Sequence, residues 1–242
     1  MGKHARKYPA RGTHALAVVY EDNHLLGVVK PGGVLVQGDK SGDTTLLDIA
    51  RAYLKKKYEK PGNVFVGLVH RVDRPVSGVV LLARTSKAAS RLAKEFSSRR
   101  VHKSYLAVVE GAMQDDTREI VGYVERTHLR SRLAEAPGPR SKEARLVCKV
   151  LGRIRGMTLL EVNPTTGRHH QIRVQLSGIG HPIVGDLKYG ASAPLPDKTI
   201  ALHAASLEVK HPTLDQTVTI TAAPPDTEPW TEFRPTIRSR FP

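Results

Sequence analysis

A short charged segment between two apolar runs constrains this chain more than any other part of its sequence. Residues 64–69 and 79–83 are apolar, and residues 70–78 between them read HRVDRPVSG. Short apolar runs bounded by Pro, Gly and Ser favour buried strands, so Asp73 is expected where such a strand ends. A carboxylate in that place must be paired, or burial will protonate it. Asp73 is therefore the first candidate for chemistry.

The charge balance of the chain indicates a polyanionic partner. Lys and Arg number 38 and Asp and Glu number 23, so the formal net charge is +15. An excess of this size is typical of proteins that bind nucleic acid. A membrane surface is the weaker alternative, because the sequence has no long basic amphipathic helix. A basic protein without a polyanionic partner is the simplest other explanation.

The single cysteine and the start of the chain narrow the class of protein. Cys148 excludes an intrachain disulfide and a zinc site built on cysteines, and it lies in a predicted strand as a small core residue. Residues 1–13 form a basic arm without the apolar segment of a secretory signal. No apolar run approaches the length of a membrane span. We therefore expect a cytoplasmic protein without membrane association, with one domain over residues 14–242.

Hydrophobic periodicity predicts many strands and few helices. This mixture indicates an α+β domain with a single mixed, mostly antiparallel sheet and a few flanking helices. Helices are expected from Thr44 or Thr45 to about Tyr58, from an N-cap at Ser86 through Phe96, over residues 169–176, and near Trp230. The polar segment 125–143 is expected to be a surface hairpin or loop. The expected strands cover residues 16–20, 25–29, 34–36, 64–69, 78–84, 104–109, 118–124, 144–151, 157–162, 201–209 and 216–222.

Three motifs that would give other functions fail in detail. Residues 33–41 have the glycines of a nucleotide-binding P-loop, but Asp39 stands where that loop needs Lys. Eleven histidines suggest a metal site, yet His169 and His170 are adjacent and would point in different directions on a helix. Ser77 lacks the flanking glycines of a hydrolase nucleophile elbow. We therefore expect no bound metal and no serine nucleophile.

Two further stretches contain candidate site residues. Residues 166–176 read TGRHHQIRVQL, which places Arg168 at the entrance of a short helix and Arg173 among its apolar residues. Arg173 is either a solvated surface residue or a buried partner that holds Asp73 ionised through a fork of hydrogen bonds. Tyr105 opens a predicted strand directly after a basic segment, where ordinary strand packing is the simpler explanation.

Together these stretches resemble the RluA-type family of RNA pseudouridine synthases. The family signature is His-Arg-Leu-Asp followed by Thr-Ser-Gly, then Lys-x-Tyr, then Gly-Arg-Thr-His-Gln-Ile-Arg with a Gly-His-Pro-Ile-x-Gly-Asp trailer. The chain matches this order from Glu21 to about His211, and residues 30–33 (KPGG) fit the family's early Lys-Pro-x-Gly turn. The resemblance implies the pseudouridine synthase fold and an RNA-uridine isomerase that needs no cofactor.

The resemblance also implies roles for individual residues. Asp73 stands where the family has its nucleophilic aspartate, and Arg173 where an arginine pairs with that aspartate. Tyr105 stands where a tyrosine packs against the target uracil, and Arg71 where an arginine takes the place of the flipped base. The side chains that we predict to contact RNA are His70, Arg71, Lys103, Arg168 and Gln171.

The chain departs from the family pattern at several positions. Val72 replaces Leu without consequence, whereas Val76 replaces Thr and removes a hydroxyl from the loop. The pair Arg74 and Pro75 stiffens this loop and adds a charge. His169 replaces a small hydroxyl residue, which puts the choice of target in doubt. Only about a dozen residues precede the first predicted strand, so the S4-type RNA-binding domain of many relatives is expected to be absent.

Three functions follow from this pattern. The first is isomerisation of specific uridines, most simply in large-subunit ribosomal RNA with transfer RNA as the alternative, by a monomer. The second is a non-catalytic RNA-binding or ribosome-assembly protein, which would be expected to lack Asp73, Tyr105 or Arg173; all three are present. The third is a glycoside or nucleoside hydrolase, but most such enzymes use two carboxylates, and no second acid lies close to Asp73 in sequence.

Overall fold

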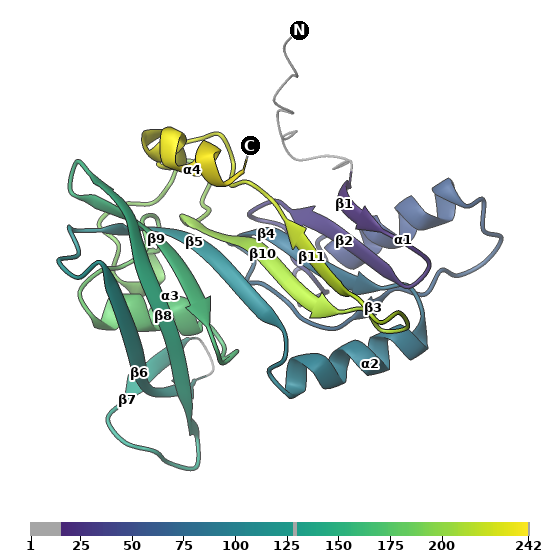
Figure 1. Ribbon diagram of the computed structural model, residues 1–242, viewed down its shortest axis with the longest axis horizontal. Coiled ribbons are helices and arrows are strands. Elements are labelled where there is room, and N and C mark those ends of the chain that lie inside the picture. The colour runs from purple at the N-terminus through teal and green to yellow at the C-terminus, as the bar shows by residue number, and fades with distance from the viewer. Residues whose placement is uncertain (1–15, 128–129, 242) are drawn as a thin grey trace, which may run out of the picture.

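A single twisted sheet runs through the computed structural model, which describes residues 16–127 and 130–241 (Figure 1). The predicted basic arm at residues 1–13 lies outside the described residues. Strand order is β1-β2-β4-β10-β5-β9-β8-β6-β7, with β11 paired to β10 and β3 paired to β4. The described strands are β1 (Ala17–Glu21), β2 (Leu25–Lys30), β3 (Gly67–Leu68), β4 (Ser77–Ala83), β5 (His102–Glu110), β6 (Thr117–Arg126), β7 (Ser131–Ala134), β8 (Ser141–Ile154), β9 (Met157–Pro164), β10 (Leu202–Lys210) and β11 (Thr217–Thr221).

The pairing confirms the predicted α+β class with a mixed, mostly antiparallel sheet. Among the pairs of the described strands, only β4 and β10 run parallel, with His203 opposite Ser77. β5 joins two halves of the molecule, because it pairs with β10 on one edge and β9 on the other (Figure 1). The helical segments are α1 (Leu46–Lys57), α2 (Ser86–Ser97), α3 (Gln171–Gly178), α4 (Arg234–Arg240) and the short 3-10 turns η1 (Leu187–Tyr189) and η2 (Trp230–Phe233).

Helices cover both faces of the sheet around β4, which explains why this strand is apolar throughout. Successive side chains of a strand point to opposite faces. Val80 and Leu82 belong to the larger core cluster, which includes Leu46, Ala50 and Leu54 of α1. Val79, Leu81 and Ala83 belong to a second cluster with Ala88 and Leu92 of α2. The loop that carries Asp73 therefore enters a strand that is buried on both sides.

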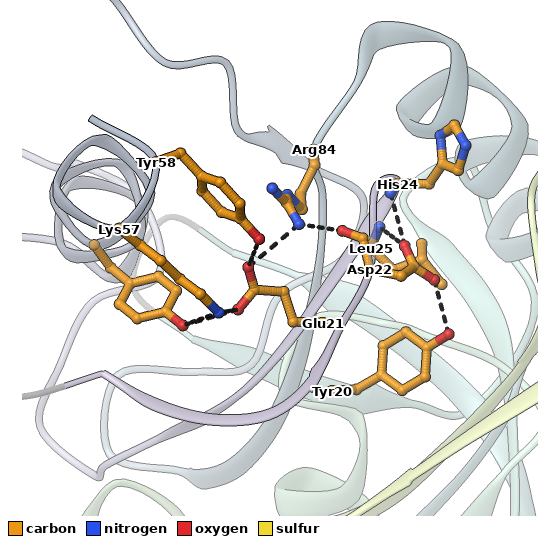
Figure 2. A network of polar contacts seen from close by, with 9 residues as sticks. Tyr20, Glu21, Asp22, His24, Leu25, Lys57, Tyr58 and Arg84 are labelled. Carbon is orange, nitrogen blue, oxygen red and sulfur yellow. Dashed lines mark hydrogen bonds and ion pairs between the residues drawn. The ribbon is translucent and has the colours of Figure 1, made fainter. Parts of the chain in front are cut away.

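Two adjacent carboxylates at the end of β1 fasten this half of the molecule (Figure 2). The Glu21 carboxylate accepts hydrogen bonds from Tyr53, Lys57 and Tyr58 at 2.6–2.8 Å, and a longer one from Arg84 at 3.3 Å. Through these contacts it joins β1 to α1 and to the residue that follows β4. The neighbouring Asp22 carboxylate accepts from the Tyr20 hydroxyl, from the backbone N–H groups of His24 and Leu25, and from the His211 ring. We call Glu21 and Asp22 with these donors the Glu21–Asp22 network.

Residues 34–36 do not form the predicted strand. Two of their carbonyl oxygens instead accept hydrogen bonds from the first turn of α1. The backbone N–H of Leu46 donates to the carbonyl of Leu35, and that of Leu47 donates to the carbonyl of Val36. The first N–H groups of a helix have no partner within the helix, so this use of the segment removes it from the sheet. Thr45 is the N-cap of α1, as one of the two predicted alternatives, and forms a capping box with Asp48.

The predicted strand at residues 64–69 shortens to the two residues of β3. β3 pairs with β4 only at Gly67 with Ala83 and Leu68 with Leu82. The next N–H group of β4, that of Leu81, donates to the Nε2 atom of His70 at 2.8 Å. A side chain therefore takes the place of a strand partner, and the chain is free to turn into the Asp73 loop.

Helix starts also differ from the prediction at two places. The N-cap of α2 is Thr85, one residue before Ser86, and its hydroxyl accepts from the N–H of Ala88. α3 begins at Gln171, because His170 has the left-handed backbone conformation (φ 54°) and breaks the helix predicted from residue 169. Cys148 is buried in β8, as predicted.

Gly78 permits the close contact between β4 and β10. Its φ of +118° is unfavourable for other residues, and a Cβ atom there would collide with the backbone of Ala204. The glycine of the Ser77-Gly78 pair therefore has a structural role. It brings the start of β4, just after the Asp73 loop, against the start of β10.

Candidate active site and nucleic-acid interface

The Asp73 loop is held mainly through its backbone. The N–H of Val76 donates to the carbonyl of Asp73, and the carbonyl of Arg74 accepts from the N–H of Gly33. The Lys30 ammonium lies beneath the loop, fully buried, and donates to the carbonyls of Pro31, Val34 and Arg74 at 2.8–3.1 Å. Burial lowers the pKa of Lys30 to about 7, although the Asp73 charge opposes this shift. The sequence indicated Lys30 only as part of a turn.

Arg173 contacts Asp73, as the sequence predicted for a buried partner. Its Nη1 atom lies 3.1 Å from the Asp73 Oδ2 atom. The other side of the guanidinium forms two hydrogen bonds with Asp186, at 2.6 and 2.8 Å. Burial works against the charge of Arg173, but its hydrogen bonds and charge attraction with Asp186 and then Asp73 outweigh burial and raise its pKa. Arg173 is therefore a fixed cation that faces the Asp73 carboxylate.

Sequence reasoning missed Asp186 as a site residue. Its carboxylate is 1% exposed and uses both oxygens to orient Arg173. The signal was the Gly-Asp pair that ends the trailer at residues 180–186. No periodicity marks such a pair as a partner of a helix residue 13 positions earlier.

A histidine also lies close to Asp73, at the residue before α3. The Nε2 atom of His170 lies 3.5 Å from the Asp73 Oδ2 atom, and its Nδ1 atom lies 2.7 Å from the Tyr189 hydroxyl. The rings of His169 and His170 stack with their centroids 3.7 Å apart. The expectation that the adjacent histidines point in different directions was therefore wrong, because neither lies in regular helix.

A cleft of about 490 Å³ opens beside Asp73 and Arg173. Tyr105 of β5 lines it, and burial together with the Asp73 charge raises the pKa of this phenol to about 12. The ring is therefore neutral at physiological pH and available as an apolar, stackable face. Besides Arg173, the cations that line the cleft are Arg71, Arg99, Lys103 and Arg168.

The residues predicted to contact RNA fall into two groups. Arg71 is exposed and lines both this cleft and a second one of about 430 Å³, which His169 and Lys188 also line. Lys103 and Arg168 also line the first cleft. Burial lowers the pKa of Lys103, so an anion from outside the chain would stabilise its charged form. These three remain predicted RNA contacts with suitable positions.

His70 and Gln171 form hydrogen bonds within the protein. His70 accepts from Leu81 and stacks on Phe96 at 4.7 Å, and burial lowers its pKa to about 3. The Gln171 side chain is buried and bonds to Thr166, to the N–H of Arg168 and to a backbone carbonyl. Both residues line the cleft, and these hydrogen bonds shape its loops, so a contact of either residue with RNA stays a prediction.

The described residues give no other kind of site. Within residues 16–127 and 130–241, no group of three or more His, Cys, Asp and Glu side chains is placed to hold a metal ion. No helix in the same part of the chain is both long and apolar enough to cross a membrane.

The fold and the site define a class of protein. A family model described as RNA pseudouridylate synthase matches residues 24–178, a range that contains Asp73, Tyr105 and Arg173. Because this match covers more than half of the chain, the chain belongs to the RNA pseudouridylate synthase family. The resemblance drawn from its sequence is confirmed.

Individual relatives sharpen this assignment. Ribosomal large subunit pseudouridine synthase D of Xylella fastidiosa is 38% identical over 225 residues, which cover 87% of this chain and 66% of the relative. Ribosomal large subunit pseudouridine synthase C of Vibrio parahaemolyticus is 32% identical over 85% of this chain and 64% of its own. tRNA pseudouridine synthase C of Pectobacterium carotovorum is 32% identical over 86% of this chain and 58% of its own. The chain thus spans less than two thirds of the length of each of these relatives.

Solved structures support the same fold. Human RNA pseudouridylate synthase domain containing 4 has a TM-score of 0.74 at 22% identity, over 92% of this chain and 93% of its own. Human RNA pseudouridylate synthase domain containing 1 has a TM-score of 0.69 at 26% identity, over 93% of this chain and 95% of its own. The pseudouridine synthase fold predicted from the sequence is therefore confirmed.

Proposed function

We propose that this chain converts uridine to pseudouridine in structured RNA, with Asp73 as the residue that acts on the sugar. One observation carries the proposal: the Asp73 carboxylate lies in a cation-lined cleft and contacts the fixed guanidinium of Arg173 at 3.1 Å. Arg71, Lys103 and Tyr105 line the same cleft. A carboxylate that contacts a fixed guanidinium in a cation-lined cleft suits a reaction on a polyanion.

The reaction rearranges a single nucleotide and consumes no external reagent. The bond between uracil N1 and C1′ breaks, and a bond between C5 and the same C1′ forms. The proton that leaves C5 is balanced by the proton gained at N1, so nothing is consumed. Asp73 would attack C1′ or stabilise the positive charge that develops there, as carboxylates do in glycosyl transfer. Arg173 would hold the carboxylate in place throughout.

The target base must first leave its stack, since a protein carboxylate cannot reach the glycosidic bond inside a helix. Base flipping costs a few kcal/mol, roughly, in duplex nucleic acid. Arg71 is exposed at the mouth of both clefts and is suited to fill the space that the base leaves. Tyr105 offers a neutral ring on which uracil can stack. Lys103 and Arg168 would neutralise the backbone around the flipped nucleotide.

Large-subunit ribosomal RNA is the substrate that we propose first. Two of the relatives described above are named as ribosomal large subunit pseudouridine synthases and a third as a tRNA pseudouridine synthase. Transfer RNA is therefore the second candidate. We further propose that residues 14–242 act as one catalytic domain and as a monomer, in the cytoplasm, where both RNAs are available.

Pseudouridine mapping tests this proposal. The purified full chain is incubated with large-subunit ribosomal RNA and with a transfer RNA pool, and pseudouridines are located by carbodiimide modification and primer extension. The wild type is expected to add pseudouridine at defined sites, and Asp73→Asn to add none while it still binds RNA. Equal modification by the two proteins would refute the role of Asp73.

Two further readouts separate the alternative functions. A nucleoside hydrolase would release free uracil, whereas an isomerase keeps it on the RNA. A binding protein without catalysis would show neither product in the wild type. RNA affinity is expected to fall steeply as salt is raised, because contacts to phosphates release counterions. A flat salt response would contradict the proposed role of the cations.

A further inference from the structure

A continuous path of polar contacts joins β7 to the Asp73 carboxylate. The backbone N–H of Ser131, at the start of β7, donates to the Tyr189 hydroxyl at 2.9 Å. This hydroxyl lies 2.7 Å from the Nδ1 atom of His170. The Nε2 atom on the other side of the same ring lies 3.5 Å from the Asp73 carboxylate. Neither the phenol nor the imidazole has a part in the chemistry proposed above.

The ring of His170 is neutral, so it has one proton and two places to put it. Burial lowers the pKa of His170 to about 3, although the nearby Asp73 charge opposes this shift. Burial also raises the pKa of Tyr189, so the phenol keeps its proton. Which ring nitrogen bears the hydrogen is then decided by the partner of each nitrogen.

The partners favour the hydrogen on Nε2. The Tyr189 oxygen already accepts from Ser131, and its own O–H can donate to an unprotonated Nδ1 atom. The opposite arrangement would leave the phenol proton without an acceptor among the described residues. It would also turn the Nε2 lone pair toward a carboxylate 3.5 Å away, which is repulsive. With the hydrogen on Nε2, both conflicts disappear.

Neighbouring contacts hold this arrangement in place. The Ser131 hydroxyl donates to the carbonyl of His169 at 2.6 Å and lies 2.9 Å from the Nδ1 atom of its ring. The His169 ring stacks on that of His170. The Arg173 guanidinium lies 4.9 Å from the centre of the Tyr189 ring. The imidazole therefore has little freedom to rotate or flip.

We propose that His170 is a positioning residue that presents its Nε2–H to Asp73, with its tautomer set by Tyr189 and the start of β7. This inference rests on the proposed function, because Asp73 must be the reacting carboxylate. Arg173 and His170 both lie on the Oδ2 side of the carboxylate. They would hold Oδ2 and leave Oδ1 to meet the sugar. At 3.5 Å the His170 contact is weaker than a hydrogen bond, so it orients the group more than it neutralises it.

Nitrogen NMR tests the tautomer without any RNA. Histidine labelled with ¹⁵N in both ring nitrogens distinguishes the Nε2–H tautomer from the Nδ1–H tautomer through long-range couplings to the ring protons. The His170→Gln variant identifies the signals of His170 by their loss. The wild type is expected to show Nε2–H, and Tyr189→Phe to show a mixture of the two tautomers. An Nδ1–H tautomer in the wild type, or no change in Tyr189→Phe, would overturn the inference.

A pair of amide variants tests the effect on catalysis. In His170→Gln the amide nitrogen can replace Nε2, whereas in His170→Asn the amide can replace only Nδ1. Single-turnover rates on the RNA that the wild type modifies are expected to fall by less than about twofold for Gln and by about fivefold for Asn. RNA affinity is expected to change by less than about twofold in both.

The outcomes separate this inference from the proposed function. Equal losses in the two amide variants, or a loss confined to RNA affinity, would refute the role of His170 while the enzyme remains a pseudouridine synthase. An inactive wild type would instead refute the proposed function, and the role of His170 in catalysis with it. Circular dichroism of both variants checks that neither has unfolded.

Discussion

The carboxylates of the Glu21–Asp22 network and the carboxylate of Asp73 differ in how many hydrogen bonds they accept. In the Glu21–Asp22 network each carboxylate accepts hydrogen bonds from four donors. Figure 2 draws this network without His211. Among the described residues, the Asp73 carboxylate accepts a hydrogen bond from Arg173 alone. The Glu21 side chain is 9% exposed and that of Asp73 22%. A carboxylate whose oxygens are fully used can only hold structure, whereas one with unused lone pairs in a cleft can react.

Asp186 shows that burial alone does not separate these roles. Its side chain is 1% exposed and lies next to the candidate active site, yet both of its oxygens are occupied by Arg173. Asp186 therefore acts on the reaction only through the guanidinium that it orients. The number of free lone pairs, rather than depth or distance from the cleft, distinguishes Asp73 from its neighbours.

The largest effect is expected when one carboxylate oxygen of Asp73 is replaced by an amide nitrogen, and the same change at Glu21 gives the comparison. Asp73→Asn should lower the isomerisation rate by at least about 10³-fold, because the amide cannot act as a nucleophile or carry negative charge. Glu21→Gln should leave the rate unchanged and lower the free energy of unfolding by about 1 kcal/mol, since its partner Lys57 is half exposed and screened. Rate assays and urea unfolding of both variants check this. A loss of activity in Glu21→Gln would show that Glu21 is not a purely structural carboxylate.

The next effect is expected at the buried pair of Asp186 and Arg173. Asp186→Asn removes the charge that faces a buried guanidinium and should lower the free energy of unfolding by about 3 kcal/mol. Urea unfolding measures this, with Asp73→Asn as the matched control, because that variant removes a charge from the other side of the same guanidinium. Asp73→Asn should cost less than about 1 kcal/mol, since Asp186 remains. Equal costs would mean that the two carboxylates share Arg173 evenly.

The smallest effect is expected in mild acid. There the loss of stability should come from buried imidazoles and not from the Glu21–Asp22 network. Burial lowers the pKa of His203 to about 4, and its unfolded value is about 6.5. Between these values the unfolded chain binds a proton that the folded chain excludes, so stability falls as pH is lowered through this range. From pH 7 to pH 5 this group should remove about 2 kcal/mol from the free energy of unfolding.

Glu21 should not contribute to that loss. Burial raises its pKa, but hydrogen bonds from Lys57, Tyr58 and Tyr53 outweigh burial and lower it below the ordinary value. It therefore stays ionised at pH 5. Urea unfolding at the two pH values should show a smaller loss for His203→Gln than for the wild type and an unchanged loss for Glu21→Gln. The reverse pattern would assign the acid sensitivity to the network.

The sequence predicted the parts of the site that depend on local pattern and on the family signature. The juxtaposition of Asp73 and Arg173 was expected, and the structure shows it. The roles of Lys30 and Asp186 were not expected, because each depends on a side chain that reaches under a loop from another element. His70 and Gln171 were expected to face RNA, yet both satisfy local backbone groups. Spacing locates a polar residue near a site, but it does not tell which way its polar atoms turn.

In the fold, too, features set by local pattern were predicted and features set by contacts between elements were not. Strands with regular alternation or long apolar runs were predicted within a few residues, and the mixed, mostly antiparallel sheet was confirmed. Residues 34–36 and 64–69 have strand composition, but the carbonyls of Leu35 and Val36 bond to the start of α1. Next to residues 64–69, the His70 side chain instead takes the N–H of Leu81 in β4. Such competition depends on tertiary contacts, which no local window contains.

The way Lys30 holds the Asp73 loop has an evolutionary consequence. All three of its hydrogen bonds go to carbonyl oxygens, at Pro31, Val34 and Arg74. Every amino acid offers that same carbonyl, so the anchor places no demand on side-chain identity. Mutation can therefore alter the charge and shape of the loop surface while the reactive group stays where it is. On the function proposed here, such a loop can change the RNA that it contacts without moving Asp73.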